Sequence, residues 1–134
     1  MNTLKPIVLF VLLFISIAAG GQTQAAATAR AKADYQKANE ELAGVCKLIL
    51  QRHRSDSVFL EHFKMSQTAW EQFRTIELKM KYPPREPGYY GSIHSMCLND
   101  YLTELTRERI AKLRIWIDGI EEGDACAGSI PPKE

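Results

Sequence analysis

The sequence lacks a surplus of charge of either sign, and this absence excludes two classes of partner. Its 134 residues include 17 Lys and Arg against 16 Asp and Glu. Only Lys5 lies within the first 25 residues, so the rest of the chain carries 16 basic and 16 acidic side chains, a balance of zero. Binding to nucleic acid or to a membrane surface depends on a basic excess gathered on one face. We therefore expect neither nucleic acid nor a membrane surface as a partner.

The sequence also lacks the residue clusters that mark metal, cofactor or catalytic sites. Its three cysteines form no CxxC pattern, and its three histidines are not spaced to meet on one helical face. No nucleophile and base stand together, and arginine is too basic to exchange protons near neutral pH. We predict no metal, no cofactor and no catalytic residues, and hence a protein that is not an enzyme.

The N-terminus, by contrast, has the pattern of an export signal. Lys5 precedes an uncharged, mainly apolar run over residues 7–19, which small and polar residues follow. As a helix, this run would span roughly 20 Å, too short for a bilayer core of about 30 Å. We interpret residues 1–25 as a signal peptide, cleaved after Gly20 or Ala25. The protein is then periplasmic or secreted, with no membrane insertion once the signal is removed.

Two segments carry apolar residues at helical spacing. The first, from about residue 26 to 53, repeats them in steps of three and four, at Tyr35, Ala38, Leu42, Val45 and Ile49. The second begins near Ser55–Ser57, whose side-chain oxygens can cap a new helix. Its expected stripe comprises Phe59, Phe63, Trp70, Phe73, Ile76 and Met80. We expect these aromatic side chains to supply much of the core.

A third helix is expected from near Ser92, as N-cap, to Asp118, with Gly119 closing it. No alternating β-branched run competes with these helices. The predicted fold is therefore all-α: an antiparallel up-down-up bundle of three main helices with an irregular C-terminal tail. We divide the chain into a signal peptide at 1–25, a helical domain at 26–120 and a tail at 121–134, which only Cys126 would tether.

A sparse motif runs through the second and third helices. Gln67, Trp70 and Arg74 lie three and four residues apart, so they share one helical face. Arg109 would come near them if the two helices pack antiparallel. An arginine beside a tryptophan at a helix interface contributes cation–π contact and fixes register through its forked donors. We predict a structural role for this group.

These residues also carry a family resemblance. The block Gln67, Ala69, Trp70, Phe73 and Arg74, followed by Gly91-Ser92, Cys97, Thr106, Arg109 and Leu113, resembles the LprI-like lysozyme inhibitors. That family consists of small secreted bacterial helical domains and was first defined as one of unknown function. The resemblance covers roughly residues 38–113 and implies scaffold positions at Gln67, Trp70, Arg74, Gly91, Ser92, Cys97 and Arg109.

One departure from the family concerns its disulfide. Members usually carry a cysteine four residues after the arginine, bridged to the one that Cys97 matches, but this chain has Leu78 there. Cys46 and Cys97 are expected near opposite ends of the bundle, whereas a tail could fold back far enough to bring Cys126 to Cys46. We therefore predict a Cys46–Cys126 disulfide, with Cys97 buried, free, or the link of a dimer.

The loop between the second and third helices has the richest surface chemistry. Three prolines and two glycines interrupt helix formation over residues 82–91, where Tyr82, Arg85, Tyr89 and Tyr90 stand on a stiffened backbone. The loop is either a solvated connector or a partner-binding surface, because tyrosine and arginine on a preorganised backbone bind at low entropic cost.

The sequence thus favours an exported, non-enzymatic binding protein of the cell envelope. By resemblance its partner is a lysozyme, whose two catalytic carboxylates an arginine could meet. The alternative is a periplasmic structural or assembly factor that binds another envelope protein. Oligomeric state is not predicted.

Overall fold

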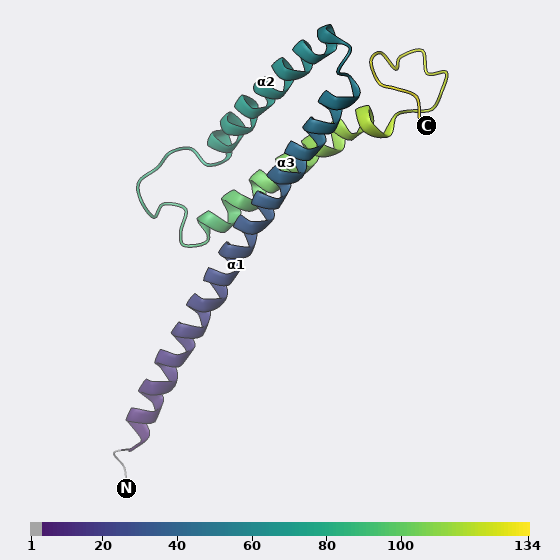
Figure 1. Ribbon diagram of the computed structural model, residues 1–134. Helices are drawn as coiled ribbons and strands as arrows, with labels where there is room; N and C mark the ends of the chain where they lie inside the picture. The colour runs from purple at the N-terminus through teal and green to yellow at the C-terminus, as the bar shows by residue number, and fades with distance from the viewer. Residues whose placement is uncertain (1–3) are drawn as a thin grey trace.

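The computed structural model describes the backbone from residue 4 and the side chains from residue 21, in both cases to residue 134. The described chain forms three helices, α1 (Leu4–Arg52), α2 (Ser57–Lys81) and α3 (His94–Asp118). Helix α2 runs back along α1, and α3 then runs alongside α1 again, while the N-terminal part of α1 extends beyond both (Figure 1). The predicted all-α bundle is confirmed.

Helix α1 is longer than expected. The sequence predicts a start near residue 26, but the helix has 49 residues and begins at Leu4, within the segment interpreted as a signal peptide. Most of that segment lies outside the residues whose side chains are described, so the signal peptide and its cleavage site stay predictions. Among the described residues, none of the helices is long and apolar enough to cross a membrane.

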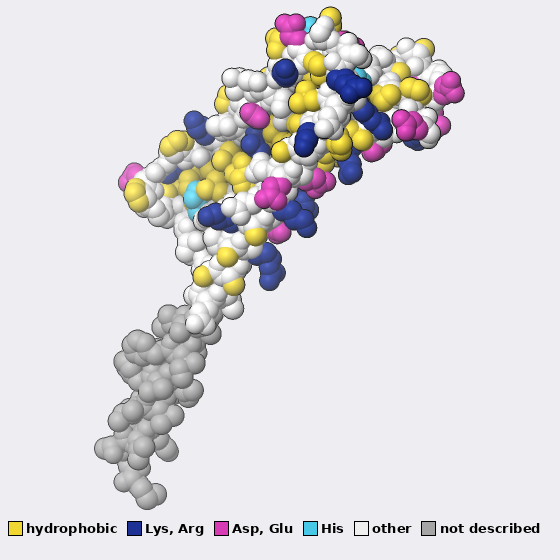
Figure 2. Space-filling model, in the orientation of Figure 1, with side chains coloured by type: hydrophobic (Ala, Val, Ile, Leu, Met, Phe, Trp, Pro, Cys, Tyr) yellow, Lys and Arg dark blue, Asp and Glu magenta, His cyan; other side chains and the backbone are white. Residues whose placement is uncertain are grey.

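The core lies mainly between α1 and α3, which pack most closely. The predicted stripe of α1 is confirmed: Ala38, Leu42 and Val45 are buried and Ile49 is fully buried, while Tyr35 is half-buried. From the other helices, the core cluster includes Phe63 on α2 and Ile110 and Leu113 on α3. Figure 2 shows hydrophobic side chains along the seam between α2 and the α1–α3 pair.

The expected stripe of α2 is only partly right. Phe63 is buried and Phe59 and Trp70 pack against the core, but Phe73, Ile76 and Met80 are exposed by 50%, 65% and 66%. The inward row follows Phe59, Phe63, Gln67, Trp70, Arg74 and Leu78 in steps of four, four, three, four and four. Because each residue turns a helix by about 100°, Phe73 points well away from its inward neighbour at position 74.

The helix ends show which capping predictions hold. Asp56 caps α2, since its Oδ1 accepts from the Phe59 amide at 2.9 Å, as the Ser55–Ser57 segment predicted. Gly119 closes α3 with a φ of 74°. Ser92, however, is not the N-cap of α3. The helix starts at His94 after Ile93, without a side-chain cap, because residues 91–94 form a turn in which the His94 amide bonds to the Gly91 carbonyl.

The tail is irregular, as predicted, but Cys126 does not tether it. Residues 119–134 fold back through backbone pairing: Ile120 donates to Pro131 at 3.0 Å and accepts from Lys133 at 2.8 Å. The Trp116 indole donates to Ser129 Oγ at 3.0 Å, while Cys126 stays exposed. Backbone hydrogen bonds therefore hold the tail in place of the predicted disulfide.

Candidate functional site

Arg74 projects from α2 into the seam between the other two helices. Its Nη1 donates to Asn39 Oδ1 on α1 at 2.9 Å and to Thr106 Oγ1 on α3 at 3.0 Å. Its guanidinium carbon lies 4.7 Å from the centre of the Trp70 ring and 5.7 Å from that of Tyr35. One arginine thus links all three helices.

Both acceptors of Arg74 are themselves held by backbone groups. Thr106 is fully buried, and its hydroxyl donates to the Leu102 carbonyl at 2.7 Å. The Asn39 amide donates to the Tyr35 carbonyl at 3.1 Å. These contacts fix the direction of both oxygens and join them with the arginine in one hydrogen-bond network, whose members strengthen one another.

Arg109 reaches the same tryptophan from α3. Its Nε donates to Gln67 Oε1 at 3.1 Å and its Nη2 to Ser66 Oγ at 3.0 Å, while its guanidinium carbon lies 5.8 Å from the Trp70 ring centre. Burial lowers the pKa of Arg109, and the nearby Cys46 thiol partly opposes that shift. Burial likewise raises the pKa of Cys46, which Arg109 opposes.

The structure therefore brings together four of the seven residues predicted as scaffold: Gln67, Trp70, Arg74 and Arg109. Trp70 contacts both arginines, and the polar contacts are all with neutral oxygens. Within the described side chains, no Asp or Glu forms an ion pair with either arginine. Chemically, the arrangement can fix helix register and hold positive charge, and neither arginine can act as a general base.

The other three predicted scaffold residues lie at the far end of α3. Gly91 takes a φ of 77° in the turn before the helix, a conformation that favours glycine. Ser92 is exposed, and Cys97 is half-buried in the first turn of α3. Gly91 therefore serves the turn, separately from the arginine group.

The loop over residues 82–91 is held by an aromatic cluster at its base. Tyr90 stacks on His94 with ring centres 4.6 Å apart, and Tyr82 meets both rings edge-on at 5.5 and 4.9 Å. The Tyr90 hydroxyl donates to the Pro83 carbonyl at 2.6 Å. Loss of hydration, together with nearby Cys97, raises the pKa of Tyr82. The sequence predicts four side chains of this loop as a partner-binding surface, but two of them, Tyr82 and Tyr90, are half-buried in its base.

Two of the predicted loop residues remain on the surface. Tyr89 is 66% exposed, and the Arg85 guanidinium lies over its ring at 5.6 Å. Arg85 forms no ion pair within the described side chains. The loop lines a shallow pocket of about 270 Å³ together with His94. It thus presents an arginine and a tyrosine on a backbone that internal contacts stiffen.

The model of the LprI lysozyme inhibitor family matches residues 16–113. The chain belongs to this family. No curated protein and no solved structure matches it. The matched residues include the whole arginine and tryptophan group and the loop, whereas the end of α3 and the tail lie beyond the match.

The cysteines of this LprI family member do not form the predicted bridge. Cys46, Cys97 and Cys126 are all free thiols in the structure. Cys46 is half-buried against the core cluster, whereas Cys126 is exposed in a tail that other contacts already hold. Leu78, at the position where the resemblance implies a cysteine, continues the inward row of α2.

Several residues that contact the two arginines of the LprI domain are absent from the predicted set. Asn39 and Tyr35 on α1 both contact Arg74, and Ser66 contacts Arg109. Asn39 lies four residues after Tyr35 of the α1 stripe and directly after Ala38, a spacing that places a polar side chain at the edge of a helix interface. That spacing was the available signal. His94 had none, because its ring contacts depend on how the loop folds.

Proposed function

We propose that this chain is an exported, non-enzymatic binding protein of the cell envelope that inhibits a lysozyme. Membership of the lysozyme inhibitor family carries this proposal, and the predicted signal peptide supports export. The arginine and tryptophan group is better suited to a scaffold than to a surface for a protein partner, because both arginines bond to neighbouring helices. The surface for the enzyme is therefore sought elsewhere on the domain.

The loop over residues 82–91 is the proposed inhibitory surface. Lysozymes cleave glycosidic bonds with two carboxyl groups in a cleft, and a guanidinium pairs well with a carboxylate. Arg85 is free of ion pairs within the described side chains, and the aromatic base of the loop limits the entropy lost on binding. Tyr89 adds a large exposed ring beside it, which suits a sugar-binding cleft.

A turbidity assay of bacterial cell-wall lysis tests this proposal. The purified chain, without residues 1–25, is titrated against a panel of lysozymes, alongside Arg85→Ala and Tyr89→Ala. Each substitution should raise the half-inhibitory concentration at least about tenfold, equivalent to about 1.4 kcal/mol. Arg54→Ala, which removes an exposed arginine from the α1–α2 turn, is the matched control and should inhibit like the unchanged chain.

Two outcomes separate the function from the surface. If the unchanged chain inhibits no lysozyme in the panel, the inhibitor function is wrong for this member. If it inhibits but Arg85→Ala inhibits equally well, the function stands and the loop is not the surface.

A second candidate function, that of an envelope assembly factor, is supported by the exposed apolar face of α2. The outer face of α2 exposes a row of apolar side chains, namely Val58, Met65, Phe73, Ile76 and Met80. Such a row suits the apolar face of a partner helix. Affinity capture from envelope extracts tests this function. It is favoured if the unchanged chain repeatedly captures one exported protein, if Ile76→Glu no longer captures that protein, and if the unchanged chain does not inhibit lysozyme.

A further inference from the structure

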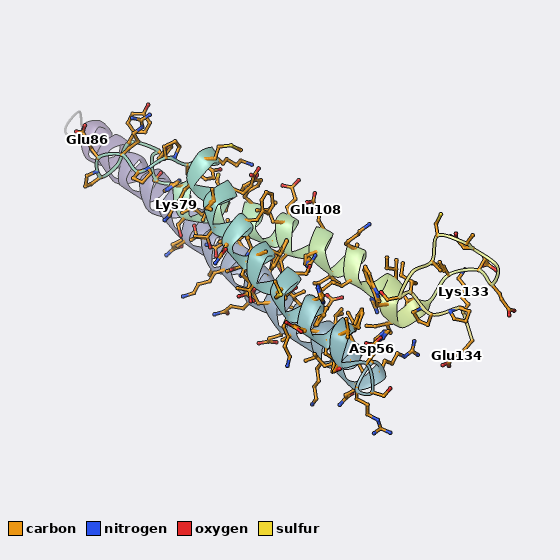
Figure 3. All side chains as sticks on the ribbon, turned by 90° about the horizontal axis from the view of Figure 1, so that it is seen from above. Asp56, Lys79, Glu86, Glu108, Lys133 and Glu134 are labelled. Carbon is orange, nitrogen blue, oxygen red and sulfur yellow. The ribbon has the colours of Figure 1, made fainter. Side chains whose placement is uncertain are left out.

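A groove between α2 and α3 forms a second surface, far from the loop. Phe59 and Phe63 line it from α2, and Leu113 and Trp116 line it from α3. Its volume is about 370 Å³, at the lower end of the range for small-molecule sites. The start of α2, marked by Asp56, lies at the same end of the bundle as the tail, whereas Glu86 in the loop lies at the opposite end (Figure 3).

The polar residues of this groove are cationic or neutral. Arg109 and Lys112 are three residues apart on α3 and share one side of it, and His62 and Ser66 face them from α2. No Asp or Glu lines the groove. Lys112 forms no ion pair within the described side chains.

Not all hydrogen-bond donors of Arg109 are used within the described residues. A guanidinium carries five N–H groups, and here Nε and Nη2 bind Gln67 and Ser66. Its Nη1 has no hydrogen-bond partner among the described residues. A half-buried cation without a carboxylate is costly, because burial removes hydration that no counter-charge replaces. An anion in the groove would lower that cost.

We infer that the α2–α3 groove binds a small amphipathic anion, an acyl or alkyl chain that ends in a carboxylate or phosphate. The apolar chain lies on Phe59, Phe63, Leu113 and Trp116, and the anionic head meets Arg109 and Lys112. The volume limits the occupant to a short or medium chain. Free fatty acids and monoalkyl phosphates share this chemistry.

This site does not depend on the proposed inhibitor function. Trp116 and Ser129, which line the groove, lie beyond the residues that match the family model. The indole of Trp116 donates to Ser129, so the tail completes the wall of the groove. The site therefore lies in part outside the residues that match the family model.

Calorimetric titration tests the site with three probes of equal chain length: decanoate, decyl phosphate and decanol, each below its aggregation concentration. We expect both anions to bind at least about tenfold more tightly than decanol. Lys112→Glu should weaken the anions at least about tenfold and leave decanol nearly unchanged. Arg107→Ala, which removes an exposed arginine outside the groove on the same helix, is the control and should bind like the unchanged chain.

Nuclear magnetic resonance locates the binding. Trp116 lines the groove and Trp70 does not, so decanoate should shift the indole N–H signal of Trp116 much more than that of Trp70. Equal binding of decanoate, decyl phosphate and decanol would overturn the inference, as would unchanged decanoate binding by Lys112→Glu. Absence of binding at millimolar concentration, or an unshifted Trp116 signal, would also overturn it. A preference for one anion over the other identifies the head group.

Discussion

Replacing Arg74 with alanine tests whether one side chain holds the three helices in register. The change removes donors to Asn39 and Thr106 and the contact with the Trp70 ring. A hydrogen bond from a charged donor contributes about 1.5–3 kcal/mol, and an exposed cation–π contact about 0.5–1 kcal/mol. Relief of the arginine's own desolvation offsets part of this sum. We expect Arg74→Ala to lower the free energy of unfolding by about 2–4 kcal/mol.

Urea denaturation of the chain without residues 1–25 measures this loss, and a double-mutant cycle assigns it. Thr106→Val keeps the shape of the fully buried side chain and removes the acceptor. Because the two residues are in direct contact, the effects of the two changes should be non-additive by about 1 kcal/mol. Arg107→Ala, on the exposed side of α3, should stay within about 0.5 kcal/mol of the unchanged chain. A loss below about 1 kcal/mol for Arg74→Ala, or strict additivity with Thr106→Val, would refute the assigned role.

Three further outcomes are expected. Phe63→Ala should cost about 3–5 kcal/mol in urea denaturation, whereas Ile76→Ala on the exposed face should cost no more than about 0.5; a large loss at Ile76 would mean that this face is covered in solution. Gly119→Ala should release the tail and lower the free energy of unfolding by about 1–3 kcal/mol, because φ at this position is 74° and the added Cβ would lie 2.7 Å from the Pro132 carbonyl oxygen of the tail. Unchanged protease resistance of the tail would contradict this. Maleimide labelling at pH 8, followed by mass spectrometry, should modify the exposed Cys126 rapidly and Cys46 slowly, because burial raises the pKa of Cys46 and so lowers its thiolate fraction. An unreactive Cys126 in the unreduced chain would instead support the Cys46–Cys126 bridge.

Local sequence signals predicted the elements well where one signal dominated. The stripe of α1 from Ala38 to Ile49 has a single apolar face, so its period determines which side is buried. Asp56 and Gly119 mark helix ends through chemistry that needs no distant partner. The spacing of Trp70 and Arg74 likewise places both on one face of α2. These features could be read from neighbouring residues alone.

The remaining features depend on contacts between distant segments. Helix α2 carries two apolar rows, and periodicity does not tell which one faces the bundle. In the structure the inward row is the one that contains Arg74, whose partners lie on the other two helices. The tail is held by backbone pairing of Ile120 with Pro131 and Lys133, which leaves no compositional trace. Asn39 belongs to the arginine group only because Arg74 of α2 donates to it across the seam, a contact that local spacing on α1 does not predict.

The uneven packing of the bundle has a consequence for its motions. Helices α1 and α3 form most of the core, whereas α2 contributes one buried hydrophobic residue, Phe63, among the described side chains. Elements with few buried contacts open at lower free energy than the whole domain. In hydrogen exchange, the amides of α2 should therefore exchange through a partial opening while α1 and α3 stay protected. Such an opening would separate Arg109 from Trp70, and Arg74 from Asn39 and Thr106, and it would remove one wall of the groove without unfolding the protein.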